Sequence, residues 1–199
     1  MLSVLLACVL AYLLGSIPNG LVLCRLIWHI DIRAYGSHNI GATDVWRTLG
    51  KGPGVLVFFL DFLKGLLGVW FGLVLSGEPW VMILGGIFAI VGHSASIFLK
   101  FQGGKGVATG LGVIAMLMPE PTLVVFFVWL LIVYSTKYVS LGSMVAAALV
   151  PVLAAAFGKP VEYIVFGTLA AVFIIYRHKA NIGRLLHGTE TKIKAGHRA

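Results

Sequence analysis

The segment between Gly92 and Gly112 has the residue types and spacing best suited to holding a phosphate group. Within it, Gly103-Gly104-Lys105-Gly106 stands directly before an apolar run that can form a helix. Glycines let backbone N–H groups approach an anion closely, and a helix N-terminus adds about half a positive charge behind them. The segment therefore predicts a phosphate cradle that includes Lys105. A glycine-rich connection between membrane helices with one snorkelling lysine fits the same stretch equally well.

A second polar segment, Gly36 to Arg47, offers hydroxyl and amide donors beside a guanidinium. Its candidate phosphate ligands are Ser37, Asn39, Gly41, Thr43 and Arg47. We expect Thr43 to N-cap a short helix that carries Arg47 over the same face and ends at Gly50. Small donors next to an arginine suit phosphate binding. An interfacial helix with a structural cap is the alternative interpretation.

The third polar segment, Arg177 to Lys192, predicts a helix that leaves the membrane and stops at Gly188. On that helix His178 and Asn181 lie one turn apart and face the same way. A histidine and an asparagine at the end of a span can orient a substrate hydroxyl or accept its proton. A basic tail is more often an anchor on a phospholipid surface, so this segment taken alone favours the anchor.

The elements that must position these residues are membrane helices. Of the 199 residues, 59% are hydrophobic and 11% are charged, and the mean hydropathy is +1.00. An ordinary soluble domain carries about 25% charged residues, so a soluble domain is excluded. The net charge of +8 comes from residues beside apolar runs, which favours a topology signal and a small anionic substrate over nucleic acid. We expect a single membrane-embedded domain over residues 1–199.

Seven apolar segments can be marked, which predicts an all-α bundle of seven transmembrane helices. They cover residues 2–26, 54–76, 79–99, 107–118, 121–136, 139–157 and 161–177. Segments 107–118 and 121–136 are short for the roughly 20 residues that a perpendicular span needs. The first segment lacks a basic n-region and is too long for a removed signal peptide, so we interpret it as a span.

The loops between these segments alternate in charge. Odd-numbered loops and the C-terminal tail are rich in Lys and Arg, whereas the even-numbered loops carry Glu78, Glu120, or Lys159 with Glu162. By the positive-inside rule, the N-terminus lies outside and the C-terminus is cytoplasmic. We therefore expect the polar segments to converge on the cytoplasmic face of the membrane.

Several features inside the spans also predict structure. Asp61 and Lys64 are three residues apart, so they share a helical face, and we favour a structural ion pair over catalysis. The polar stretch from Gly15 to Gly20 contains a proline that can kink the first span, with or without opening a groove toward lipid. Gly68 and Gly72 form a small-xxx-small pattern that permits close helix packing.

Three stretches taken together resemble the polar motifs of the bacterial acyl-phosphate:glycerol-3-phosphate acyltransferase family, PlsY. They are GSHNIGATDVWRTLG, GHSASIFLKFQGGKGVATG and RHKANIGRLLHGTETKI, in the family's order and over most of the chain. The residues that match are Ser37, Asn39, Gly41, Thr43 and Arg47; His93, Gly103, Gly104, Lys105 and Gly106; and His178, Asn181 and Glu190. The chain differs at His38, Asp44 and Ala95, where glycine, asparagine and proline are common.

This resemblance implies transfer of a fatty acyl group from acyl phosphate to the 1-hydroxyl of glycerol 3-phosphate, giving lysophosphatidic acid and inorganic phosphate. It implies a multi-pass protein of the bacterial cytoplasmic (inner) membrane with a cytoplasmic active site, functionally coupled to the enzyme that makes acyl phosphate. Both substrates carry phosphate, which fits two glycine-rich basic loops. The acyl tail fits a site against the lipid bilayer.

The residue types suit distinct roles in this reaction. We assign Arg47, Lys105 and the loop N–H groups to holding phosphate and stabilising charge on the leaving group and carbonyl oxygen. The residues expected to position glycerol 3-phosphate are Ser37, Ser143, His178 and Asn181. The remaining expected substrate-binding residues are Asn39, Gly41, Thr43, His93, Gly103, Gly104, Gly106 and Glu190. For the proton we favour the oxygen of acyl phosphate over His178, because no acid near His178 in sequence would orient its ring.

Other reaction classes and functions fit less well. The chain has no His-x-x-x-x-Asp of acyl-CoA-dependent acyltransferases, no Gly-x-Ser-x-Gly elbow and no pair of loop acids placed for a metal. We therefore expect no covalent acyl-enzyme, no metal and no cofactor. A small transporter of phosphorylated metabolites is the alternative function, although internal repeats are absent and the polar residues crowd one face. A membrane anchor or assembly factor would leave the three polar segments without purpose.

Overall fold

A computed structural model describes residues 1–193, and every regular element in that range is a helix. The fold class is therefore all-α, as the sequence predicts. The elements are α1 (Leu2–Ser16), α2 (Asn19–Trp28), η1 (Ile32–Ala34), α3 (Ala42–Leu49), α4 (Lys51–Leu75), α5 (Pro79–Ser94), η2 (Ile97–Leu99), α6 (Val107–Leu117), α7 (Pro119–Thr136), α8 (Val139–Ala156), α9 (Val161–Arg177) and α10 (Lys179–Leu186).

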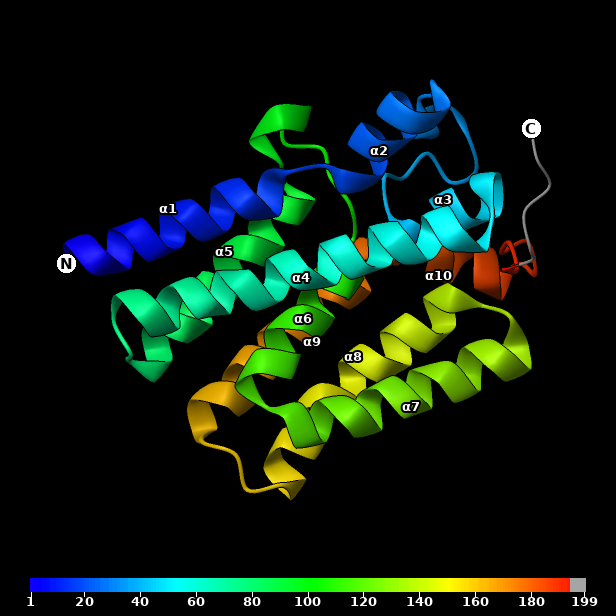
Figure 1. Ribbon diagram of the computed structural model, residues 1–199. Coiled ribbons are helices and arrows are strands. Elements are labelled where there is room, and N and C mark those ends of the chain that lie inside the picture. Colours follow the sequence, from blue (N-terminus) through cyan, green and yellow to red (C-terminus); the bar gives the residue numbers. More distant parts are fainter. Residues whose placement is uncertain (194–199) are drawn as a thin grey trace. The chain divides into compact units, whose positions relative to one another are not determined.

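The described chain forms two compact units, residues 1–116 and 117–193. In the first unit α1, α4 and α5 pack against one another, and Figure 1 shows them side by side. In the second unit α8 packs against both α7 and α9. The single domain expected over residues 1–199 stays a prediction.

Glycines allow the helices of the first unit to pack closely. A Cβ atom at Gly68 would collide with Ala89 and the Gly85 carbonyl. A Cβ atom at Gly72 would collide with the Val81 carbonyl and the Met82 backbone. The small-xxx-small pattern on α4 therefore packs against α5, as predicted. Close backbone approach of this kind is how membrane helices gain van der Waals contact without a hydrophobic driving force between them.

The first apolar segment is broken where the sequence predicts a kink. α1 ends at Ser16, α2 begins at Asn19, and the two helices are bent by 40° at this break. Pro18 has no N–H for a helical hydrogen bond and disfavours the α conformation at Ile17, which is extended at φ −60° and ψ 116°. The freed carbonyl groups of Ser16 and Ile17 accept hydrogen bonds from side chains of other elements.

The second unit contains a sharper break. α9 and α10 are bent by 59° at His178, which separates them. The predicted continuous helix from Arg177 to Gly188 is therefore wrong in detail: a new helix starts at Lys179 and ends at Leu186, and Gly188 follows with a φ of 69°. The bend changes the direction of the chain directly after the histidine.

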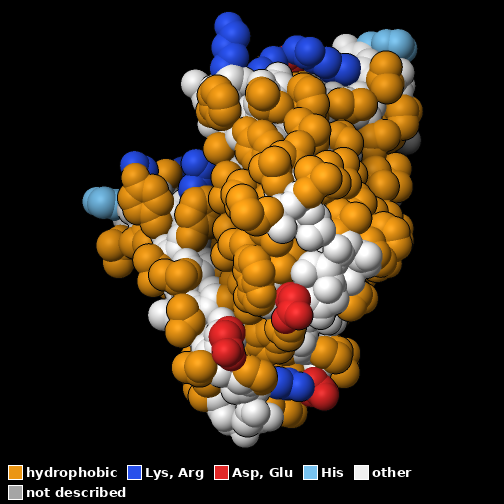
Figure 2. All heavy atoms as spheres, turned by 90° about the vertical axis from the view of Figure 1, so that its left-hand side faces the viewer, with side chains coloured by type: hydrophobic (Ala, Val, Ile, Leu, Met, Phe, Trp, Pro, Cys, Tyr) orange, Lys and Arg blue, Asp and Glu red, His pale blue; other side chains and the backbone are white. Residues whose placement is uncertain are grey.

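The helix lengths and apolar surfaces are those of a multi-span membrane protein. Among the described residues, four helical stretches are long and apolar enough to cross a membrane, or up to six if each bent pair counts as one span. α6 is apolar but has only 11 residues, so it is not among these stretches, consistent with its short segment in the sequence. Hydrophobic side chains cover most of the face seen in Figure 2. The predicted number of seven spans is not established by these helices.

Candidate functional site

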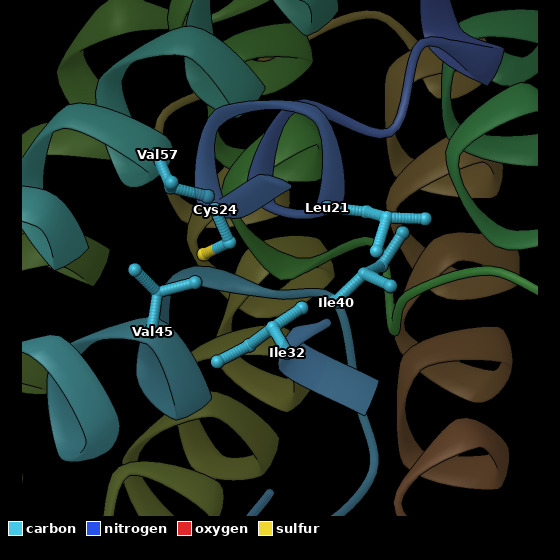
Figure 3. Close-up of a cluster of buried hydrophobic side chains, with 6 residues drawn as sticks. All are labelled: Leu21, Cys24, Ile32, Ile40, Val45 and Val57. Carbon is cyan, nitrogen blue, oxygen red and sulfur yellow. The ribbon is translucent and has the colours of Figure 1, made fainter. Parts of the chain in front are cut away.

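The polar segment from Gly36 to Arg47 rests on an apolar base within the first unit. Figure 3 shows six buried side chains that converge from α2, η1, the following loop, α3 and α4. They are Leu21, Cys24, Ile32, Ile40, Val45 and Val57. Leu99, six residues before Lys105, packs against the same cluster. The 36–47 loop and the start of the glycine-rich segment therefore share one packed support.

Asp44 organises the polar side of this loop. Its Oδ2 atom accepts hydrogen bonds from the Ser37 backbone N–H at 3.2 Å, the Ser37 hydroxyl at 2.6 Å and the Asn39 N–H at 3.1 Å. Its Oδ1 atom accepts from Arg47 Nη1 at 3.2 Å, and only 2% of Asp44 is exposed. Asp44 thus orients Ser37 and Arg47 together, although sequence reasoning noted it only as a departure from the family pattern.

The expected cap of α3 is wrong. Gly41, not Thr43, is the N-cap residue, and Thr43 is the second residue of the helix. The Gly41 N–H donates to Asn39 Oδ1 at 3.0 Å, so the asparagine closes the turn before the helix. Gly50 ends the helix with a φ of 98°, as predicted. Arg47 lies in the last turn, with 14% of its side chain exposed.

His38 lies in a backbone conformation that most side chains disfavour. Its φ is 60°, a left-handed conformation that glycine adopts at less cost. The exposed ring places Nδ1 2.9 Å from the Arg33 carbonyl oxygen.

The glycine-rich segment packs on the C-terminal end of α5. The Gly104 N–H donates to the His93 carbonyl at 3.0 Å, and the Gly103 N–H donates to the Ser94 carbonyl at 3.1 Å. These two N–H groups thus hold the turn itself, which changes the role expected of them as phosphate donors. A Cβ at Gly103 would collide with the His93 carbonyl, and one at Gly104 would collide with the His93 ring.

The chain beyond these glycines still presents positive charge before a helix. Gly106 has a φ of 82° and accepts the Gly110 N–H at 2.7 Å, so it stands at the start of α6. Lys105 is half-buried directly before it. A helix N-terminus with an adjacent lysine is a favourable place for an anion.

In the second unit, Glu190 collects three donors. It accepts the Ser140 hydroxyl at 2.8 Å, the Asn181 amide at 2.8 Å and Arg184 Nε at 2.7 Å. Burial alone would raise the pKa of the Glu190 carboxyl, but the hydrogen bonds and the Arg184 charge outweigh burial and lower the pKa. Glu190 therefore connects α8, α10 and the segment after α10 as an ionised acceptor, a role the sequence did not indicate.

His178 is oriented by the main chain. Its Nδ1 atom lies 2.8 Å from the Ile174 carbonyl oxygen one turn earlier, and 3% of the residue is exposed. A carbonyl can only accept, so Nδ1 carries the proton and Nε2 holds the lone pair of the neutral ring. A nearby acid is thus not needed to orient this histidine.

Ser143 uses its hydroxyl within the helices. Its Oγ donates to the Val139 carbonyl at 2.8 Å and accepts from Trp129 Nε1 at 3.3 Å. The hydroxyl is also buried. These contacts make Ser143 a link between α7 and α8, and its expected contact with substrate stays a prediction.

Comparison with known proteins assigns this chain to a family. The family model described as glycerol-3-phosphate acyltransferase matches residues 5–188. The chain belongs to this family. It is 47% identical over 185 residues to the glycerol-3-phosphate acyltransferase of Syntrophomonas wolfei, covering 93% of this chain and 94% of that protein. It is 49% identical over 189 residues to glycerol-3-phosphate acyltransferase 2 of Moorella thermoacetica, covering 95% and 97%.

Solved structures support the same assignment. The crystal structure of PlsY (YgiH), an integral membrane glycerol 3-phosphate acyltransferase, in its glycerol 3-phosphate form matches with a TM-score of 0.91 and 43% identity, covering 96% of each chain. Its lysophosphatidic acid form matches with a TM-score of 0.88 and 42% identity, covering 96% of this chain and 95% of that one. The family resemblance and the all-helical membrane fold are confirmed.

Proposed function

We propose that this protein is a membrane acyltransferase that moves a fatty acyl group from acyl phosphate to the 1-hydroxyl of glycerol 3-phosphate. The products are lysophosphatidic acid and inorganic phosphate. One observation carries this proposal: the three polar segments of the family resemblance fold as hydrogen-bonded clusters with buried side chains, on helices suited to a bilayer. Preorganised donors of this kind are what electrostatic catalysis requires.

Arg47, Lys105 and the N-terminus of α6 are the proposed phosphate-binding groups. Asp44 fixes the Arg47 guanidinium at 3.2 Å, which limits the entropy lost when the arginine binds an anion. Lys105 adds a point charge at the start of α6. As the acyl C–O bond to phosphate breaks, negative charge grows on the leaving phosphate, and these cations stabilise it.

Ser37, His178 and Asn181 are the proposed groups that position glycerol 3-phosphate, with Ser143 as a further candidate. The 1-hydroxyl oxygen attacks the acyl carbonyl carbon, the bond from that carbon to the phosphate oxygen breaks, and phosphate leaves. The hydroxyl proton passes to a phosphate oxygen, with His178 Nε2 as the competing acceptor. Because acyl phosphate is an activated anhydride, proximity and charge stabilisation supply much of the rate.

The proposed topology has seven spans with the N-terminus outside and the C-terminus in the cytoplasm of a bacterial inner membrane. The basic odd-numbered loops support it. α6, at 11 residues, is about 16 Å long at 1.5 Å per residue, so as a span it requires a thinned bilayer or partial crossing. Membrane-impermeant thiol labels should reach the introduced thiols of Glu78→Cys and Glu162→Cys variants only from outside, and labelling of both from the cytoplasm would overturn this topology.

A transporter of phosphorylated metabolites is the competing function. The decisive experiment measures inorganic phosphate released from synthetic acyl phosphate by the purified protein, with and without glycerol 3-phosphate. The enzyme should release phosphate and form lysophosphatidic acid only when glycerol 3-phosphate is present. Uptake of glycerol 3-phosphate into sealed vesicles without any acyl transfer would favour the transporter. An enzyme that makes acyl phosphate is the expected functional partner.

A further inference from the structure

A buried polar network lies in the first unit behind the glycine-rich segment. It contains Asp61, Lys64 and His93, whose exposed fractions are 2%, 3% and 5%. α4 supplies the ion pair and α5 supplies the histidine. The proposed reaction assigns no role to Asp61 or Lys64.

Asp61 Oδ1 is the centre of this network. It lies 2.9 Å from Lys64 Nζ, 3.8 Å from His93 Nδ1, and accepts the Asn19 amide at 3.1 Å. Lys64 Nζ also donates to the Ile17 carbonyl at 3.0 Å, at the break between α1 and α2. The network therefore ties the broken first helix to α4 and α5.

Stability alone is a poor reason to keep such a pair. Removing two charges from water costs several kcal/mol per ion, and apolar replacements of a buried pair are often neutral or stabilising. Ionisable groups inside membrane segments are rare and commonly functional for the same reason. The residues that surround the Asp61–Lys64 pair indicate which function it has.

His93 connects the pair to the phosphate-binding segment. The Gly104 N–H donates to the His93 carbonyl at 3.0 Å, and the space that a Gly104 side chain would need is filled by the His93 ring near Nε2. The other ring nitrogen, Nδ1, is the one 3.8 Å from Asp61 Oδ1. The imidazole thus lies between the carboxylate and the turn that precedes Lys105.

We propose that the Asp61–Lys64 pair is a positioning device that fixes the His93 ring and, through it, the Gly103–Gly104 turn that presents Lys105 to phosphate. This inference rests on the proposed function in one respect: the Gly103–Gly104 turn must help to bind a ligand that carries phosphate. Asp61 and Lys64 are positioning residues that touch no substrate. They act by holding the turn in the conformation that binds.

The test compares the full-length wild-type protein with the double variant Asp61→Leu/Lys64→Met, which replaces the pair by apolar groups of similar size. The control is Glu120→Gln/Lys159→Gln. It removes an ion pair in which Lys159 Nζ lies 2.7 Å from Glu120 Oε2 and which is more exposed than the Asp61–Lys64 pair. Thermal unfolding reports the fold, and binding of inorganic phosphate reports the turn without any need for turnover. Steady-state kinetics separate KM from kcat for both phosphorylated substrates.

The proposal predicts an Asp61→Leu/Lys64→Met protein that unfolds within about 5 °C of the wild type. Its phosphate affinity should fall about tenfold or more, because a displacement of about 1 Å in a binding group can cost on the order of 100-fold. KM for the substrate held by the turn should rise more than kcat falls. The control should match the wild type in all three measurements.

A folded double variant whose phosphate affinity and KM values stay within about twofold of the wild type would overturn the proposal. If the Leu/Met variant does not fold, Asp61→Asn/Lys64→Gln is judged by the same measurements. A wild-type protein that binds phosphate but transfers no acyl group would end the proposed function and leave the positioning test valid. A wild-type protein that binds no phosphate would overturn both.

Discussion

The Ser37 hydroxyl donates to the Asp44 carboxylate at 2.6 Å, while the other oxygen of that carboxylate pairs with Arg47 at 3.2 Å. One buried acid thereby sets the direction of a hydroxyl and of a guanidinium. Positioning of this kind lowers the entropy lost on binding and leaves the donors in place when charge develops. The polar segment from Gly36 to Arg47 is therefore preorganised by its own fold.

Two substitutions at Asp44 should lower activity by very different amounts. Asp44→Asn keeps one acceptor oxygen for the Ser37 and Asn39 donors, so kcat/KM should stay within about fivefold of the wild type. Asp44→Ala removes the carboxylate oxygens that accept from Ser37, Asn39 and Arg47 and should lower kcat/KM on the order of 100-fold. Equal activities of the two variants would contradict the role given to the carboxylate oxygen.

Loss of the Glu190 charge should destabilise the second unit in a pH-dependent way. The folded pKa of Glu190 is lowered, so its stabilisation is fully present above the ordinary Glu pKa of about 4.3 and is lost as pH falls through the folded value. Glu190→Gln should lower the free energy of unfolding by about 2 kcal/mol at neutral pH.

Thermal unfolding measured from pH 7 down to pH 3 checks this prediction. The difference in melting temperature between wild type and Glu190→Gln should shrink only below about pH 4.3. A difference that is constant across this range would show that charge is not the reason for the destabilisation.

Alanine substitutions at Gly103 and Gly104 should lower catalytic activity by different amounts. A Cβ at Gly103 meets the backbone carbonyl of His93, whereas one at Gly104 meets the His93 ring, which can move. Gly103→Ala should therefore lower kcat/KM more than Gly104→Ala does, with losses on the order of 100-fold and 10-fold. Gly183→Ala is the matched control, because nothing lies within 4 Å of the added atom. Similar activities of all three variants would show that the turn needs no close approach.

His178→Gln separates the two candidate proton acceptors. Glutamine can hydrogen-bond a hydroxyl but is not a base near neutral pH, so substrate-assisted transfer should retain about 1–10% of kcat with KM little changed. The pH profile of the remaining activity should lose any histidine-like inflection. Complete loss of turnover with unchanged substrate binding would instead make His178 the base.

Three patterns that depend on near neighbours in sequence were predicted correctly. The Asp61–Lys64 pair follows from their spacing of three residues, and the break before Asn19 follows from Pro18. Close packing at Gly68 follows from residue size alone. Such features need no knowledge of what the rest of the chain places nearby.

Contacts between distant residues escaped prediction. Ser140 and Glu190 are 50 residues apart, and only the folded second unit brings the hydroxyl to the carboxylate. The role of Asp44 depends on a loop whose His38 has a positive φ, which no periodic pattern shows. Thr43 looked like a cap because its residue type suits one, but the cap is Gly41, two residues earlier, and the helix begins at Ala42.

The central claim is that Lys105 binds phosphate for acyl transfer, and its direct test compares two lysines of one segment. Lys100 is exposed and belongs to no part of the proposed site, so Lys100→Ala should release phosphate from acyl phosphate at the wild-type rate when glycerol 3-phosphate is added. Lys105→Ala should keep the wild-type melting temperature and lose about 100-fold or more in kcat/KM. Near-normal turnover by folded Lys105→Ala would contradict the account.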